Sequence, residues 1–217
     1  MTRNRKKACS LTPSIRSPQR RLQRDKDFTG DRLTSFRQVI LRHGLPGALL
    51  ATICFAVPSL RDPFADSLAR GLESPWYYGV MAWLIFAALN AYAWRLDRGW
   101  DISKIVWIIY LGALSFWEEW VFRLALPELF ESWGASLWLA ILISAVLFGG
   151  AHYFTLRWKW QWCVGAALGG VMLSRQMEVH NDLLLITAFH WVATYLNTPR
   201  PPGSSAREKA AETETLV

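Results

Sequence analysis

The sequence has few cysteines, and none of them are spaced to form a metal or disulfide framework. Its three cysteines, Cys9, Cys54 and Cys163, lie far apart and form no CxxC motif. The HExxH pattern of many zinc proteases is also absent. A small disulfide-stapled domain and a zinc ribbon are therefore excluded.

The N-terminus lacks the apolar stretch of a secretory signal peptide. Residues 1–43 carry 12 Lys or Arg against 3 Asp, a charge of +9, whereas the whole chain carries +7. The remainder is thus slightly acidic at −2, which gives no support to a nucleic-acid partner. We expect a basic tail over residues 1–43, disordered over 1–31, with an amphipathic helix over 32–42 on a membrane surface. A solvated charged linker is the alternative for both parts.

Long apolar segments follow the basic tail. Apolar residues make up 52% of the chain, and Trp occurs 13 times. A helix needs about 17 or more apolar residues to span a membrane, and several segments are near that limit. We predict an all-α, polytopic transmembrane helix bundle over residues 44–198, followed by a polar C-terminal tail over 199–217. About six spans are expected, at residues 44–60, 75–95, 104–126, 136–155, 160–175 and 183–198.

The charges of the loops predict the orientation of these spans. Basic residues follow the second and fourth segments, whereas the loop after the third contains only Glu128 and Glu131. The positive-inside rule then places both termini in the cytoplasm, for a protein integral to a bacterial inner membrane. Arg61 and Arg70, in the first external loop, argue weakly against this orientation.

Three ionisable residues, Glu118, Glu119 and Arg123, interrupt the third apolar segment. Such groups cost at least a few kcal/mol each in hydrocarbon unless they are paired or hydrated, so they indicate a functional site. Glu119 and Arg123 are four residues apart on one helical face, where they can pair. Glu118 is turned about 100° away and has no such partner. We interpret Glu119–Arg123 as structural and Glu118 as the group free for chemistry. The alternative is an ion-pair network that only fixes helix packing.

Two histidines, His152 and His190, lie on apolar segments further along the chain. Either one alone is as often a packing residue as a functional one. Together with the two glutamates they form a candidate acid–base set. A carboxylate takes a proton from water, one imidazole assists it, and the other donates to an oxyanion.

Helix geometry sets one difficulty for this site. Glu118 lies about 21 Å along a helix that begins at Lys104, whereas His152 is close to the end of the fourth segment. Straight parallel helices would keep the two apart. Helix tilt, a later helix end or a shortened third segment is needed to bring them together.

The order of these motifs resembles the CPBP intramembrane proteases, also known as the CAAX-protease and bacteriocin-processing family. Here EExxxR begins at Glu118, FxxxH ends at His152, and Hxxx(N/D) begins at His190, within residues 100–198. The resemblance implies that Glu118 and His152 act on a water, while His190 and residue 194 stabilise the oxyanion. This chain departs from the family at Thr194, where Asn or Asp is usual, although a Thr hydroxyl can also donate a hydrogen bond. Asn197, on the same helical face, is the candidate to replace it.

These observations favour an intramembrane endopeptidase of the glutamate type, with no cofactor and no metal. Its partners would be membrane lipid and a membrane-anchored or lipidated peptide substrate. Prenylated CAAX-like C-termini, leader peptides and sorting anchors all remain open as substrates. One alternative is a zinc-dependent CAAX-type protease with His152, His190 and Glu118 as ligands. Another is a non-catalytic membrane scaffold or immunity protein.

Overall fold

The computed structural model describes residues 22–24, 26–28, 30–99 and 101–204. The predicted tails before residue 22 and after residue 204 lie outside the described residues. Helices make up almost all of the described part, and the only β-structure in it is two isolated bridges. The predicted all-α fold is therefore confirmed.

Two of the helices contain a π-helical turn and are otherwise continuous. The first runs over Phe36–Ala56, and the second over Ile102–Ser132. In chain order the elements are α2 (Phe36–Val39), the π turn η1 (Ile40–Gly44), α3 (Leu45–Ala56), the 3₁₀ turn η2 (Pro58–Leu60), α4 (Arg61–Glu73), α5 (Pro75–Asp97), α6 (Ile102–Glu119), the π turn η3 (Trp120–Ala125), α7 (Leu126–Ser132), α8 (Leu137–Thr155), α9 (Trp160–His180) and α10 (Leu183–Asn197).

Four helices in the described part are long and apolar enough to cross a membrane, namely Phe36–Ala56, Pro75–Asp97, Ile102–Ser132 and Leu137–Thr155. The fifth predicted segment forms the 21-residue helix α9, and the sixth forms the shorter, apolar 15-residue helix α10. Six helices of the described part thus occupy the six predicted positions. With four of them long enough to span, the chain is an integral membrane protein.

The first span differs from the prediction at both ends. Residues 36–43, which we expected in an amphipathic surface helix, form the first turns of the spanning helix. Val39 and His43 are buried there against other helices. Residues 61–73, expected as an external loop, form the helix α4. The burial of Val39 and His43 makes the start of this helix part of the bundle interior.

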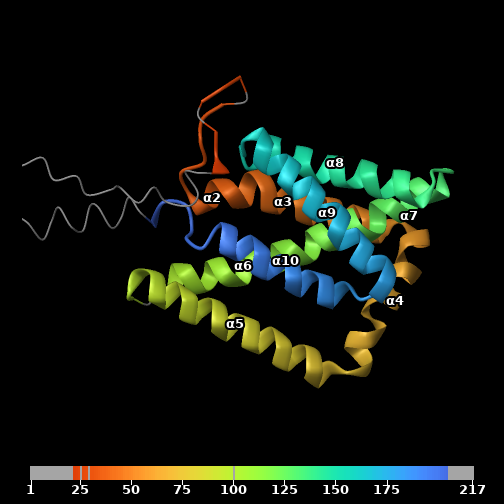
Figure 1. Ribbon diagram of the computed structural model, residues 1–217, viewed down its shortest axis with the longest axis horizontal. Coiled ribbons are helices and arrows are strands. Elements are labelled where there is room, and N and C mark those ends of the chain that lie inside the picture. Colours follow the sequence, from red (N-terminus) through yellow and green to blue (C-terminus); the bar gives the residue numbers. More distant parts are fainter. Residues whose placement is uncertain (1–21, 25, 29, 100, 205–217) are drawn as a thin grey trace, which may run out of the picture.

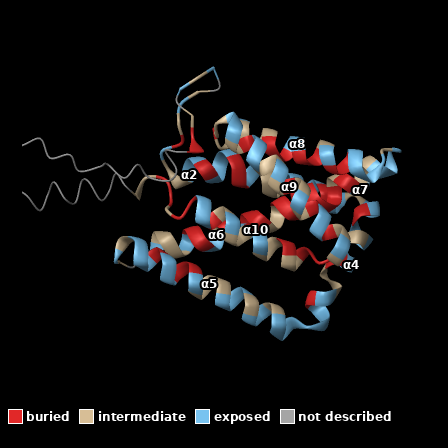
Figure 2. Cartoon of the chain, in the orientation of Figure 1, coloured by how far each residue is buried: buried red, intermediate tan, exposed pale blue. Residues whose placement is uncertain are grey.

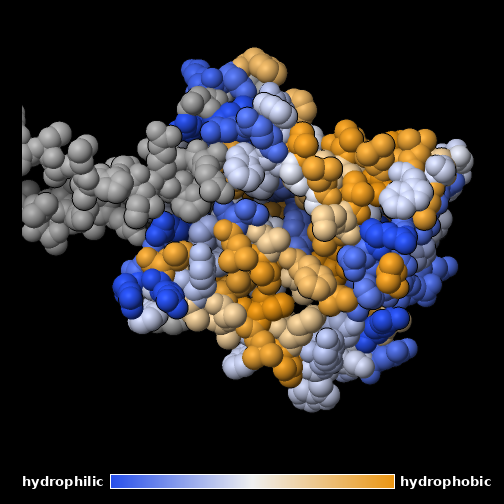
Figure 3. All heavy atoms as spheres, viewed as in Figure 1, coloured by the Kyte–Doolittle hydropathy of each residue, from blue (hydrophilic) through white to orange (hydrophobic). Residues whose placement is uncertain are grey.

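Large apolar side chains cover much of the outside of the bundle. Trp76, Trp83, Leu168 and Met172 are each more than half exposed. The helix α5 is exposed along most of its length (Figure 2). On the face shown in Figure 3, apolar residues gather across the middle and hydrophilic residues toward the two ends. A belt of exposed apolar surface between polar ends is the pattern of a protein surrounded by lipid.

A proline explains where each π turn occurs. Pro46 and Pro127 each lie two residues after the end of a π turn, η1 and η3 respectively. Proline has no N–H and its ring clashes with the carbonyl of the preceding turn, so the helix widens there instead of continuing unchanged. The carbonyl of Phe122, five residues before Pro127, accepts a hydrogen bond of 2.5 Å from the Ser144 hydroxyl instead. The widened turn is thereby tied to α8.

The helices are staggered along the bundle. Helices α6 and α10 run along its centre, with α5 on one side and α8 and α9 on the other (Figure 1). The N-terminal end of α6 extends well beyond the C-terminal end of α8. The last turn of α8, which carries His152, therefore lies level with the middle of the long helix Ile102–Ser132. This stagger removes the difficulty that straight, level helices posed for the site. The described chain also starts and finishes at the same end of the bundle.

Candidate active site

Glu118 is the centre of a buried polar cluster. It lies in the last turn of α6, directly before the π turn η3, and only 4% of its surface is exposed. Histidines from three other helices surround its carboxylate: His43 from η1, His152 from α8 and His190 from α10. Side chains 75 residues apart in the sequence thus meet at one group.

His43 makes the only hydrogen bond to Glu118 among the described residues that meets ordinary geometric criteria. Its Nε2 lies 2.9 Å from Glu118 Oε1, and its Nδ1 lies 2.7 Å from the hydroxyl of Thr155. The Thr155 hydroxyl is also 2.5 Å from the carbonyl of Ala151. A carbonyl has no hydrogen, so Thr155 must donate to Ala151 and accept from His43 Nδ1.

A proton must therefore be shared between His43 and Glu118. Because Nδ1 of His43 already donates to Thr155, Nε2 of the neutral imidazole has only a lone pair. The contact of His43 Nε2 with Glu118 Oε1 then requires a proton between these two atoms. Either Glu118 is protonated and donates, or His43 is an imidazolium and donates to an ionised Glu118.

When the His152 ring is neutral, its Nε2 carries no hydrogen and faces Glu118. Its Nδ1 lies 2.9 Å from the carbonyl of Phe148, which can only accept a hydrogen bond. Its Nε2 lies 3.8 Å from Glu118 Oε1. That separation is too long for a direct hydrogen bond. It leaves both atoms able to contact one intervening water.

His190 lies between the two glutamates. Its Nδ1 is 2.5 Å from Glu119 Oε1, and its Nε2 is 3.7 Å from Glu118 Oε2. The adjacent carboxylates of the EE pair thus lie at opposite edges of one imidazole, with Glu119 in close contact and Glu118 beyond direct hydrogen-bond distance. Glu119 fixes the orientation of the ring, and Nε2 is the atom directed toward Glu118.

The Glu119–Arg123 pair lies behind the histidines. Arg123 Nε is 3.3 Å from Glu119 Oε2, and both side chains are fully buried. The guanidinium stacks 4.2 Å above the ring of Phe148. A Cβ at Gly170 of α9 would come within 3.1 Å of that guanidinium, so glycine leaves room for it. Arg123 therefore connects the α6–η3 junction to α8 and α9.

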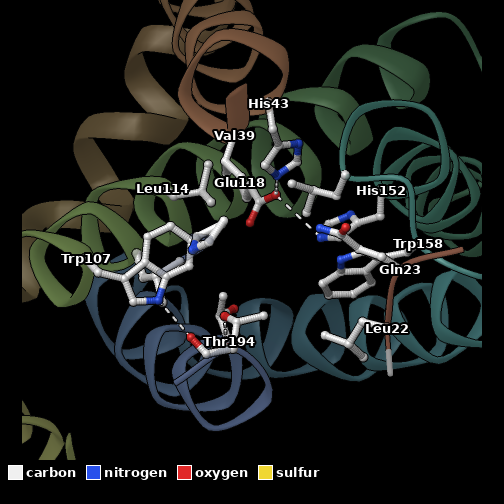
Figure 4. Close-up of a pocket in the computed structure, with 14 residues that line it drawn as sticks. Leu22, Gln23, Val39, His43, Trp107, Leu114, Glu118, His152, Trp158 and Thr194 are labelled. Carbon is white, nitrogen blue, oxygen red and sulfur yellow. Dashed lines mark hydrogen bonds and ion pairs between the residues drawn. The ribbon is translucent and has the colours of Figure 1, made fainter. Parts of the chain in front are cut away.

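Thr194 lines the cavity beside Glu118, whereas Asn197 does not. Thr194 is part of the wall together with Glu118 and His152 (Figure 4). Asn197 is exposed, and its amide donates to the carbonyl of Ala193 at 3.0 Å. The structure thus places Thr194, which departs from the third motif, at the site, and it places Asn197, the candidate to replace it, outside the site.

The cavity at this cluster is small. Its volume is about 40 Å³, and its polar lining consists of Gln23, His43, Glu118, His152, Thr194 and Thr198. A buried water needs about 10–15 Å³ on this measure together with two to four polar partners. The cavity therefore suits one or a few waters in contact with Glu118.

The same residues offer a donor set for a metal ion, but not the set that the sequence predicted. Ligand atoms of His43, Glu118 and His152 all lie within 4.8 Å of one another. Two imidazoles and one carboxylate are the ligands of many catalytic zinc sites. Our sequence-based alternative named His190 as the second histidine. The structure instead places His43 in that position, with His190 held by Glu119.

All six predicted site residues come together in the structure, whereas two of their neighbours were not predicted. Glu118, Glu119 and Arg123 are joined by His152 and His190, with Thr194 in the cavity wall. Their catalytic roles stay predictions.

His43 was missed because residues 1–43 were assigned to the tail, and Thr155 was missed because its role depends on the contact with His43. The available signal was that His43, one of only four histidines, directly precedes an apolar segment.

One protein family matches this chain, over residues 100–196. Its description is Type II CAAX prenyl endopeptidase Rce1-like. The match contains all three motifs of the resemblance, and it confirms that resemblance for this part of the chain. Comparison with curated proteins and with solved structures gives no match. His43 lies outside the matched region.

Proposed function

Because residues 100–196 are Rce1-like, we propose that this chain is an intramembrane endopeptidase in which Glu118 and His152 activate a water. The observation that supports this most is the convergence of Glu118, His152 and His190, from three helices, on a buried cavity of water size. A scaffold would not need an ionisable cluster of this kind in a membrane bundle.

In the proposed first step, a water in the cavity lies between Glu118 Oε1 and His152 Nε2. The ionised carboxylate takes one proton from the water as the oxygen attacks the carbonyl carbon of the substrate. His152 accepts the second hydrogen of the water in a hydrogen bond, because its Nδ1–H is committed to the Phe148 carbonyl. These two contacts orient the oxygen for attack.

The second step breaks the peptide bond. Attack converts the carbonyl oxygen to an oxyanion, which Thr194 and His190 stabilise by donating hydrogen bonds. An imidazole protonated on both nitrogens can donate to Glu119 and to the oxyanion together. Glu118 then delivers the proton that it took from water to the departing nitrogen as the C–N bond breaks, which leaves a carboxylic acid and a free amine as products.

His43 keeps Glu118 in place during this cycle. When Glu118 is ionised, the shared proton rests on His43, whose Nε2 donates to Oε1 over 2.9 Å. The bond to Thr155 fixes the ring from the other side. Glu118 therefore has a fixed orientation without losing its second oxygen, Oε2, to another hydrogen bond.

The proposed substrate is a membrane-anchored or lipidated peptide, because lipid-facing helices surround the cavity. Prenylated CAAX-like C-termini, leader peptides and sorting anchors are the classes to compare. The proposed setting is a bacterial inner membrane with both termini in the cytoplasm, as the loop charges indicate.

The test uses purified full-length protein in lipid and one fluorescent reporter peptide from each of these classes. We expect cleavage of one class by the wild type and none by Glu118→Gln, which keeps the shape but removes the base. Glu131→Gln is the matched control, because Glu131 is an exposed carboxylate on α7. Equal cleavage by wild type and Glu118→Gln would exclude Glu118 as the base.

A zinc-dependent protease is the second candidate, and the triad His43, Glu118 and His152 is the observation that favours it. In that case the three side chains would be metal ligands, and zinc would supply the Lewis acid that activates the water. The two candidates differ in a measurable way. Zinc analysis of the purified, active protein gives about one equivalent in the second case.

A further inference from the structure

A short N-terminal segment, residues 22–24, pairs with the loop between α8 and α9 as an isolated strand pair. The N–H of Arg24 donates to the carbonyl of Arg157 at 2.9 Å, and the N–H of Lys159 donates to the carbonyl of Leu22 at 2.9 Å. These two bonds flank an antiparallel bridge between Gln23 and Trp158. The segment therefore lies extended along the loop that follows His152.

The side chains of this segment form part of the wall of the catalytic cavity. Leu22 is 2% exposed and Gln23 is 8% exposed. Both line the cavity that Glu118 and His152 share (Figure 4). The next residue, Arg24, directs its guanidinium to the carbonyls of Tyr153 and Trp158, at 2.7 and 2.9 Å. The segment therefore has an apolar residue, Leu22, at the cavity and, two residues later, a basic residue, Arg24, that is hydrogen-bonded to the loop.

On the side of Glu118 that faces His152, the cavity has no room for a substrate while this segment is bound. A volume of about 40 Å³ accommodates a few waters but no residue of a peptide. The other walls belong to the helices α2, η1, α6, α8 and α10, to the loop after α8 and to the segment after α10. Leu22 and Gln23 belong to a short segment that comes before the first helix of the bundle, and two backbone hydrogen bonds and the Arg24 guanidinium hold this segment. This segment can leave the cavity without unfolding any of the helices α2 to α10.

We propose that the loop edge at residues 157–159 is the binding site for an extended substrate segment, and that residues 22–24 occupy it in the resting protein. This inference rests on the proposed endopeptidase function. An incoming peptide adds as a strand, accepting from the N–H of Lys159 and donating to the carbonyl of Arg157. Strand pairing also keeps a peptide extended beside the cavity.

The contacts of the resident segment define the preferred ligand. It is a peptide with an apolar residue, then a residue that fits the buried position of Gln23, and then a basic residue. The apolar side chain takes the position of Leu22. The basic side chain donates hydrogen bonds to the carbonyls of Tyr153 and Trp158 and lies over the ring of Tyr153, as the Arg24 guanidinium does at 3.9 Å. Substrate and resident segment therefore compete for the same groups.

The first test measures proteolysis by the full-length chain. Arg24→Ala weakens the resident segment and leaves the loop intact. We expect KM for a reporter peptide to fall by at least about tenfold with kcat unchanged, since losing even one hydrogen bond to a charged group changes an equilibrium by about that factor. Phe28→Ala is the control, because Phe28 lies beside the same segment and is 88% exposed. An unchanged or raised KM in Arg24→Ala would overturn the proposal.

The second test does not require catalysis. Hydrogen exchange of the Lys159 amide reports whether a strand is paired with the loop. We expect slow exchange in the wild type and at least tenfold faster exchange in Arg24→Ala. Adding a synthetic peptide with the sequence of residues 19–28 should restore the protection.

The control peptide carries Leu22→Asp and Arg24→Asp and should give no protection. Failure of the first peptide to protect Lys159 would overturn the strand site. Restored protection in a chain that cleaves none of the reporters would support the strand site while refuting the proposed function.

Discussion

Replacing Arg123 with alanine should destabilise the folded protein strongly. The Arg123 guanidinium is the cation paired with Glu119 within the helix, at 3.3 Å, and neither side chain has any exposed surface. In Arg123→Ala the Glu119 carboxylate stays buried with His190 Nδ1, 2.5 Å away, as its remaining partner. The contact of the guanidinium with the Phe148 ring is lost as well.

The size of the effect follows from the burial of the pair. Removing one partner of a buried ion pair costs about 3–5 kcal/mol, because the other charge is left uncompensated in low dielectric. For a chain of this length, each kcal/mol lowers the melting temperature by about 2–4 °C. We therefore expect a loss of roughly 10 °C. The double variant Glu119→Gln, Arg123→Met removes both charges and should recover part of that loss.

The assay is thermal unfolding of the detergent-solubilised variants, with Arg175→Ala as the matched control. Arg175 pairs with Glu178 at 2.6 Å, but its side chain is 57% exposed. An exposed pair contributes at most about 1 kcal/mol. If Arg123→Ala and Arg175→Ala melt within 2 °C of each other, Glu119 is not held in a low-dielectric interior and the structural role of the pair is wrong.

Three further predictions concern the chemistry. His43→Phe should lower kcat about 10- to 100-fold with little change in KM, the cost of one hydrogen bond to the Glu118 charge; wild-type turnover would remove His43 from the mechanism. Thr194→Val should lower turnover about 100- to 1,000-fold, the effect of one oxyanion donor, whereas Thr194→Asn should retain activity; wild-type turnover in Thr194→Val would mean that Thr194 only packs. Strong chelators should leave activity intact and metal analysis should find no stoichiometric zinc; activity lost on chelation and restored by zinc would support metal ligation by His43, Glu118 and His152.

Spacing along single helices allowed part of the site to be predicted. The four-residue separation of Glu119 and Arg123 predicts their pairing, because neighbouring turns of a helix place such residues on one face. The same spacing separates Glu118 from that pair. The motif order then associates His152 and His190 with Glu118, and the structure brings all of them together.

Contacts that depend on packing between distant helices could not be read from the sequence. His43 meets Glu118 only because the first spanning helix begins earlier than its apolar segment does and packs on α6. The stagger of α8 against α6 is set by tertiary packing, and distances measured along one helix do not reveal it. The charge pattern of residues 32–42 fits a surface helix equally well, since periodicity alone does not reveal which surface a helix face contacts.

The π turns also change how the sequence of this site must be aligned and edited. One extra residue in η3 shifts the helix after it by about 100° relative to the helix before it. The apolar stripe of α6 and that of α7 are therefore out of phase, and a single helical wheel drawn through residues 102–132 would mix them. Deleting one residue from η3 would rotate Glu118 by about 100° relative to the helix after Pro127, and so away from its three histidines. Grafting the EExxxR motif onto an uninterrupted helix would reproduce its residues without the relative orientation of their side chains.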